Sequence, residues 1–176
     1  MLVFRSERAI ENKFRSEMRR FLLEGNTDRA LQTARRAVAM HPDSPSILII
    51  AAETAHAADC PSQSLFWLNH ANVDASRITP EELMTAGALC YQVGGFSRAE
   101  EFLKKAAEHE GPRGPSLQLL MQLLRLQGRN HDLLPLIHSQ LLTGICPSEF
   151  LFVVAWPHRV WIDDADRQLL QRLHAA

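Results

Sequence analysis

Turn-forming residues recur along this chain at an almost constant interval. They are separated by 34, 35 and 34 residues: Gly25, Asp59, Gly94 and Gly128. Prolines suited to the first turn of a helix are separated by 35, 35 and 32 residues: Pro45, Pro80, Pro115 and Pro147. Because glycine ends helices and proline begins them, two markers with one period predict a series of helix–turn–helix repeats.

The stretch from Thr79 to His109 shows one repeat in full. Thr79 and Glu82 fit a capping box around Pro80, and Ser97 with Glu100 predicts a second box at the next helix. Apolar or small residues recur at helical spacing after each box: Leu83, Ala86, Gly87, Cys90 and Tyr91, then Ala99, Leu103, Ala106 and Ala107. Two short helices cannot bury both stripes alone, so we expect neighbouring pairs of the same kind.

The same pattern divides the rest of the chain. We expect a single all-α domain over 1–176, with four clear repeats at about 10–43, 44–78, 79–113 and 114–143. Residues 144–176 keep the pattern poorly, and we interpret them as a degenerate helix pair that caps the stack. Within that pair, the aromatic side chains of Trp156 and Trp161 are candidates for an exposed apolar docking patch.

Composition narrows the classes of function. A net charge of -1 gives no reason to expect nucleic-acid binding, although residues 1–40 hold nine Lys/Arg against five Asp/Glu. Residues 41–82 hold one Arg against six Asp/Glu, which complementary packing would explain. No apolar run is long enough for a membrane span, and the three scattered cysteines fit a reducing compartment. We therefore expect a cytoplasmic protein that binds no membrane.

These repeats resemble the tetratricopeptide repeat, a helix–turn–helix unit of 34 residues. The likeness rests on two stretches: Gly25 to Ala30 with Ala34, Ala37 and Pro42, and Leu83 to Tyr91 with Gly94, Ala99, Leu103 and Ala106. The resemblance implies a right-handed α–α superhelix that holds a partner peptide or helix in a concave groove. It also implies that the first helix of each repeat lines that groove.

Polar residues on the first helices are then the candidate binding residues: Arg15, Arg19, Glu53, His56, Thr85, Gln92, Gln118, Gln122 and Arg125. Cations at both ends of such a groove would suit an acidic or carboxylate-bearing segment. The alternative is a solvated helix face without a partner. Ile49 and Ile50 indicate that part of the groove is apolar or covered. The Lys/Asn/Arg clamp that some members of this family use for a carboxylate is not matched here.

Catalytic and metal sites find little support in the sequence. The closest group of metal-ligand types, His56, Asp59 and Cys60, has no second pair at zinc-like spacing. The chain has no phosphate-binding glycine loop and no nucleophile elbow. We therefore expect neither enzyme activity nor a metal or cofactor.

The sequence thus predicts a scaffold for protein–protein interaction, present as a monomer or weak homodimer. Two alternatives stay open. The chain would also suit a bacterial secretion-type chaperone, or a repeat module of a larger multidomain protein. The sequence does not identify the partner or the pathway.

Overall fold

All the regular secondary structure in the described residues is α-helical, as the sequence predicts. A computed structural model describes residues 2–74, 78–111 and 114–142 of this chain. These ranges contain eight α-helices and no strand: α1 (Leu2–Leu23), α2 (Thr27–Met40), α3 (Pro45–Ala57), α4 (Pro61–His70), α5 (Pro80–Gln92), α6 (Phe96–Glu110), α7 (Pro115–Leu126) and α8 (Asn130–Leu142). The all-α class is therefore confirmed, whereas the predicted helix pair at 144–176 lies outside the described residues.

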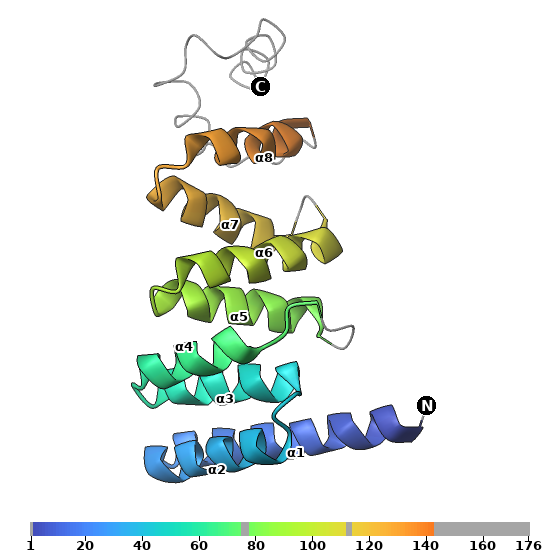
Figure 1. The fold of residues 1–176 in the computed structure, drawn as a ribbon, viewed down its shortest axis with the longest axis vertical. Coiled ribbons are helices and arrows are strands. Elements are labelled where there is room, and N and C mark those ends of the chain that lie inside the picture. The colour runs from blue at the N-terminus through green and yellow to red at the C-terminus, as the bar shows by residue number, and fades with distance from the viewer. Residues whose placement is uncertain (1, 75–77, 112–113, 143–176) are drawn as a thin grey trace, which may run out of the picture. The chain divides into compact units, whose positions relative to one another are not determined.

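Consecutive helices from α1 to α6 form three successive hairpins (Figure 1). Each of these helices packs on the next one along the chain, and in addition α1 contacts α3 and α3 contacts α5. The first helices of neighbouring hairpins therefore lie against one another. The chain divides into two compact parts after Leu123, inside α7.

The four predicted turns share one backbone geometry. Each turn residue has a positive φ: 71° at Gly25, 57° at Asp59, 82° at Gly94 and 68° at Gly128. After α1, the N–H of Asn26 bonds to the carbonyl of Phe21 at 2.8 Å, and the N–H of Gly25 bonds to Leu22 at 3.1 Å. The same two bonds close the turns after α3, α5 and α7. These are Schellman motifs, and Asp59 replaces the usual glycine because aspartate tolerates the left-handed region.

The predicted helix starts are confirmed at most positions. Prolines are the first residues of α3, α4, α5 and α7. The Ser44 hydroxyl accepts a hydrogen bond from the Ile47 backbone N–H and caps α3, and Thr79 forms the capping box of α5 with Glu82.

The second predicted capping box is wrong. Helix α6 begins at Phe96, its N-cap is Gly95, and no side chain caps it. Ser97 is therefore already inside the helix. The cause is the shortness of the turn, because the Gly95 carbonyl accepts the bond from Ala99 at 2.9 Å and so starts α6 directly after the Schellman turn.

Small residues let the helices approach closely. Alanines that recur on one face of α2 and of α6 are fully buried: Ala30, Ala34 and Ala37 on α2, and Ala99 and Ala106 on α6. Between α5 and α6 the approach is close, since a methyl group added at Gly87 would lie 2.7 Å from Cγ of Leu103. Helix α3, which contacts four other helices, has ten buried residues.

The predicted apolar stripes of α7 and α8 are buried at most positions. They include Leu117, Leu120, Met121 and Leu124 on α7 and Leu133 and Ile137 on α8. Among the helices of the described ranges, none is long and apolar enough to cross a lipid bilayer.

Candidate binding pocket

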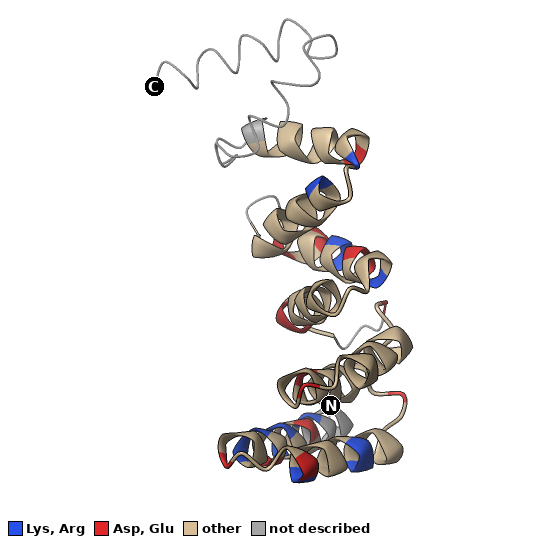
Figure 2. Cartoon of the chain, turned by 90° about the vertical axis from the view of Figure 1, so that its left-hand side faces the viewer, with Lys and Arg blue, Asp and Glu red and all other residues tan. Residues whose placement is uncertain are grey.

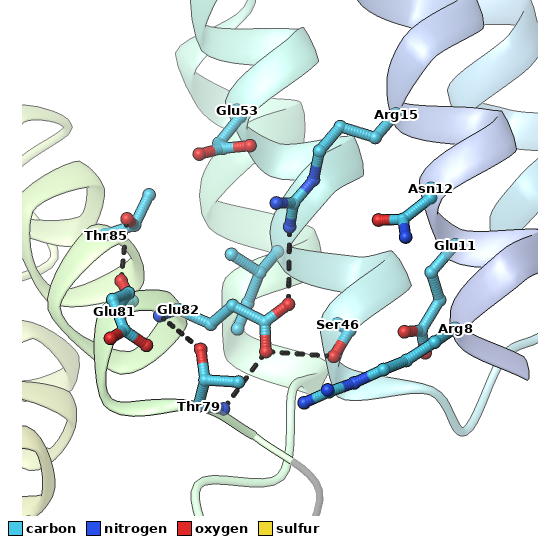
Figure 3. A pocket seen from close by; sticks show the side chains of 11 residues that line it. Arg8, Glu11, Asn12, Arg15, Ser46, Glu53, Thr79, Glu81, Glu82 and Thr85 are labelled. Atoms are coloured by element: carbon cyan, nitrogen blue, oxygen red, sulfur yellow. Dashed lines mark hydrogen bonds and ion pairs between the residues drawn. The ribbon is translucent and has the colours of Figure 1, made fainter. Parts of the chain in front are cut away.

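The first helices of the three hairpins enclose a polar pocket of about 390 Å³ (Figure 3). This volume is at the lower end of the range of about 300–1,000 Å³ that is common for ligand sites. Its lining comes from α1, α3, α5 and the residue before α5: Arg8, Glu11, Asn12, Arg15, Ser46, Ile49, Glu53, Thr79, Glu81, Glu82 and Thr85. Three consecutive hairpins therefore contribute to one hollow.

Helical spacing places these side chains on the same faces. On α1, the lining positions Arg8, Asn12 and Arg15 are four and three residues apart, which is one helical face. Ile49 and Glu53 of α3 are four residues apart in the same way. Ile49 is only 1% exposed, so this part of the pocket wall is covered, which is one of the two alternatives that the sequence indicates.

The carboxylate of Glu82 joins all three helices. One of its oxygens accepts a hydrogen bond from Arg15 of α1 at 3.3 Å. The other oxygen accepts bonds from the Ser46 hydroxyl of α3 and from the Thr79 backbone N–H, both at 3.1 Å. The side chain of Glu82 is 16% exposed and that of Arg15 is 46% exposed. Glu82 is thus both the capping residue of α5 and the junction of the pocket wall.

Glu53 differs from Glu82 because its charge is not matched. Within the described part of the chain, its carboxylate has neither a hydrogen bond nor an ion pair, and Figure 3 shows it beside the pocket on α3. Burial raises the pKa of Glu53, the attraction of Arg15 partly opposes this, and the charge of Glu82 adds to it. Glu53 is therefore a partly desolvated carboxylate that gains from a nearby cation.

The net charge of the pocket is negative. Its lining has four carboxylates against two guanidinium groups: Glu11, Glu53, Glu81 and Glu82 against Arg8 and Arg15. Glu81 is fully exposed, and hydrogen bonds from its own backbone and from Thr79 lower its pKa, so it stays ionised. Figure 2 shows Lys and Arg gathered on α1, α2 and α6, while α3 carries no basic residue except histidine.

A second hollow, of about 350 Å³, shows a different charge pattern. It lies at the end of α4 and along α6, and its lining has three cations and three carboxylates: Arg98, Lys104, Lys105, Asp74, Glu101 and Glu108. Lys105 pairs with Asp74 at 3.4 Å and with Glu108 at 3.2 Å, and Arg98 pairs with Glu101. The third cation, Lys104, pairs with Glu100 at 2.7 Å, so every charged group of this lining has an ion-pair partner.

The pocket contains three of the nine predicted binding residues, namely Arg15, Glu53 and Thr85. Arg19, His56 and Gln92 belong to the same three helices but do not line it. Gln118, Gln122 and Arg125 are on α7.

Sequence reasoning missed the half of the pocket formed by the starts of the helices. The residues concerned are Arg8, Glu11, Asn12, Ser46, Thr79, Glu81 and Glu82. Thr79 and Glu82 were expected to act only as caps. The signal that could have found this half is Arg15 itself, because stepping back one and two turns along α1 leads to Glu11 and Arg8.

Trp67 and the buried thiol of Cys90 are not part of the pocket lining. Trp67 is buried at 3% exposure, whereas its neighbour Phe66 is 54% exposed. Trp156 and Trp161 lie outside the described residues. Burial raises the pKa of the Cys90 thiol to about 12, so it stays protonated at neutral pH.

No group of three or more His, Cys, Asp or Glu side chains in the described ranges is arranged to hold a metal ion. Comparison with other proteins gave no match, either to a protein-family model or to a curated protein sequence.

Proposed function

We propose that this protein is a non-catalytic scaffold of the tetratricopeptide type, which binds a segment of a partner protein against α1, α3 and α5. The observation that carries the proposal is the pocket formed by the first helices of three successive hairpins. Recognition on the first helices is what the repeat resemblance implies, and three residues selected for that reason line the hollow. Two further features of the described chain support the repeat interpretation: the Schellman turns at intervals of 34 to 35 residues and the buried alanines of α2 and α6.

A steric block of the pocket tests this proposal. Thr85 is partly exposed on α5 and lines the pocket, so Thr85→Trp fills it without entering the core. The matched control is Gln32→Trp, an exposed position on α2 that does not line the pocket. The full-length chain is used as bait, and each captured protein is then purified and its affinity measured by calorimetry.

We expect the wild-type chain and Gln32→Trp to bind the same purified partner, and Thr85→Trp to bind it at least about tenfold more weakly, or about 1.4 kcal/mol. Circular dichroism should show equal helicity for all three chains. If Thr85→Trp keeps full affinity, the partner binds elsewhere and the proposal is wrong.

A further inference from the structure

We propose that the pocket between α1, α3 and α5 receives the guanidinium group of an arginine that the partner protein presents. This inference rests on the proposed function and names the chemistry of the partner at the same site. It departs from the acidic segment that the arginines of α1 suggest in the sequence alone. The difference comes from the positions of the charged groups around the cavity.

The charge balance of the pocket lining favours a cationic ligand. The lining carries two more carboxylates than guanidinium groups. Arg15, which sequence reasoning assigned to a carboxylate ligand, already pairs with Glu82 at 3.3 Å. An incoming carboxylate would have to compete with Glu82 for Arg15 and would lie near Glu53 and Glu81. Repulsion between like charges therefore disfavours an acidic segment and favours a cation.

The carboxylate of Glu53 lacks the partners that the carboxylate of Glu82 has. Glu82 accepts three hydrogen bonds from within the chain, whereas Glu53 accepts none from the described residues. A partly buried carboxylate without a partner is costly, and a charge-assisted hydrogen bond from a ligand offsets that cost. The second hollow gives the contrast, since each cation and each carboxylate of its lining has an ion-pair partner within the chain.

The acceptors around the cavity suit a guanidinium group better than an ammonium group. Acceptors border the cavity from three helices, including the Asn12 amide of α1, the Glu53 carboxylate of α3 and the Thr85 hydroxyl of α5. A guanidinium offers five N–H donors in a plane and is more weakly hydrated than an ammonium, so it suits several acceptors in a partly desolvated site.

The test uses a small probe on the intact chain. Nα-acetyl-arginine N-methylamide is titrated into the isotope-labelled protein, and amide chemical shifts are followed by NMR. The matched probes are the citrulline derivative, which has the same shape without the charge, and the lysine and glutamate derivatives. The protein variants are Glu53→Gln and, as control, Glu17→Gln on α1, which does not line the pocket.

We expect saturable shifts at Glu53 and Thr85 with the arginine derivative, and at least about fivefold tighter binding than with the citrulline, lysine or glutamate derivative. Glu53→Gln should reduce arginine binding to the citrulline level, while Glu17→Gln should leave it unchanged. Equal binding of arginine and citrulline, preference for lysine or glutamate, retained affinity in Glu53→Gln, or no saturable binding of arginine would each overturn the inference.

The purified partner separates this inference from the proposed function. If Thr85→Trp weakens the partner but replacing each arginine of the partner's bound segment by glutamine does not, the pocket is a binding site and the arginine inference is wrong. If Thr85→Trp has no effect on the partner, the proposed function itself fails. Loss of affinity in both experiments supports both.

Discussion

Helix α5 presents one side to α6 and another to the pocket, and the two sides are built differently. Toward α6 it has Gly87, whose missing side chain leaves space for the buried Leu103. Toward the pocket it has Glu81, Glu82 and Thr85. Small residues bring the α5 and α6 backbones together, and long polar side chains line a cavity between α5, α3 and α1.

On α5, the residues that stabilise the fold and the residues proposed to bind a partner therefore lie on different sides. A closely packed contact has no space for a ligand, and its energy comes from dispersion and apolar burial. The pocket wall contains ionisable groups that contribute little to stability, because a partly exposed ion pair such as Arg15–Glu82 is typically worth about 0–1 kcal/mol. Variants of the α5–α6 contact should therefore change stability, and variants of the pocket should change binding.

The largest loss of stability is expected when a close helix contact of α6 is overfilled. Ala106 is completely buried, and Ala106→Trp forces a large ring into a close helix contact. We expect a loss of about 1–3 kcal/mol or more, enough to unfold a marginal chain. Thermal melts followed by circular dichroism measure it. The control is Ala39→Trp, at an exposed position of α2. A stable Ala106→Trp would show that this alanine is not at a helix contact.

The next largest loss of stability is expected when the polar contacts of Arg98 are removed. Arg98 donates hydrogen bonds to the carbonyls of Leu68, at 3.2 Å, and Ala71, at the end of α4, and its guanidinium lies over Phe102. Arg98→Ala leaves both carbonyls without this donor, and we expect a loss of about 1–3 kcal/mol in urea unfolding.

Lysine at the same position tests the reason for the Arg98 effect. Arg98→Lys keeps the charge but has no planar group that reaches two carbonyls at once, so it should recover only part of the loss. Full recovery would mean that the charge alone matters. Neither variant should change the affinity of the pocket for the arginine probe.

In Gly87→Ala, two effects of similar size on stability oppose each other. Alanine is favoured over glycine in a helix by about 1 kcal/mol, while the new methyl group would lie 2.7 Å from Leu103 Cγ. Since Leu103 is fully buried and cannot move away easily, we expect a net loss of about 0–2 kcal/mol. Adding Leu103→Ala removes the clash, so the double variant should be more stable than the sum of the single effects. Strict additivity would contradict the close contact.

The smallest effect on stability is expected at the pocket. Burial raises the pKa of Glu53 when the chain folds, so the folded state holds this proton more tightly than the unfolded state. The resulting stability is present below the ordinary pKa of glutamate and is lost as the pH rises through the raised value. Glu53→Gln should therefore be slightly more stable than the wild type at pH 8, with no difference at low pH. Urea midpoints of Glu53→Gln and Glu17→Gln across this range measure the effect. A Glu53→Gln chain that is less stable at pH 8 would show that Arg15 outweighs burial.

Local sequence signals predicted the helices and turns well, because their causes lie within a few residues. The Schellman turns depend on a residue that tolerates positive φ, and the starts of α3, α5 and α7 depend on proline. The exception was the start of α6. A serine and a glutamate at the spacing of a capping box do not form one when the preceding turn leaves no residue outside the helix.

The candidate site was only partly predictable. Periodicity placed Arg15, Glu53 and Thr85 on the correct faces of their helices, but it gave no information on how the helices align along their axes. That alignment brings Glu82 to Arg15 and Ser46, and it leaves Glu53 unmatched. The sign of the charge on the proposed ligand follows from this pairing. A list of charged residues could not have given it.

The sequence by itself determined the all-helical class, the spacing of the turns and the residues that turn the chain. Proline fixes its own φ, and glycine permits a positive φ because it has no Cβ, so these features need no long-range information. Only the tertiary structure decided which carboxylate is neutralised and which is not. Charges from three helices interact over a few ångströms, and those distances are set by how the side chains of the core pack.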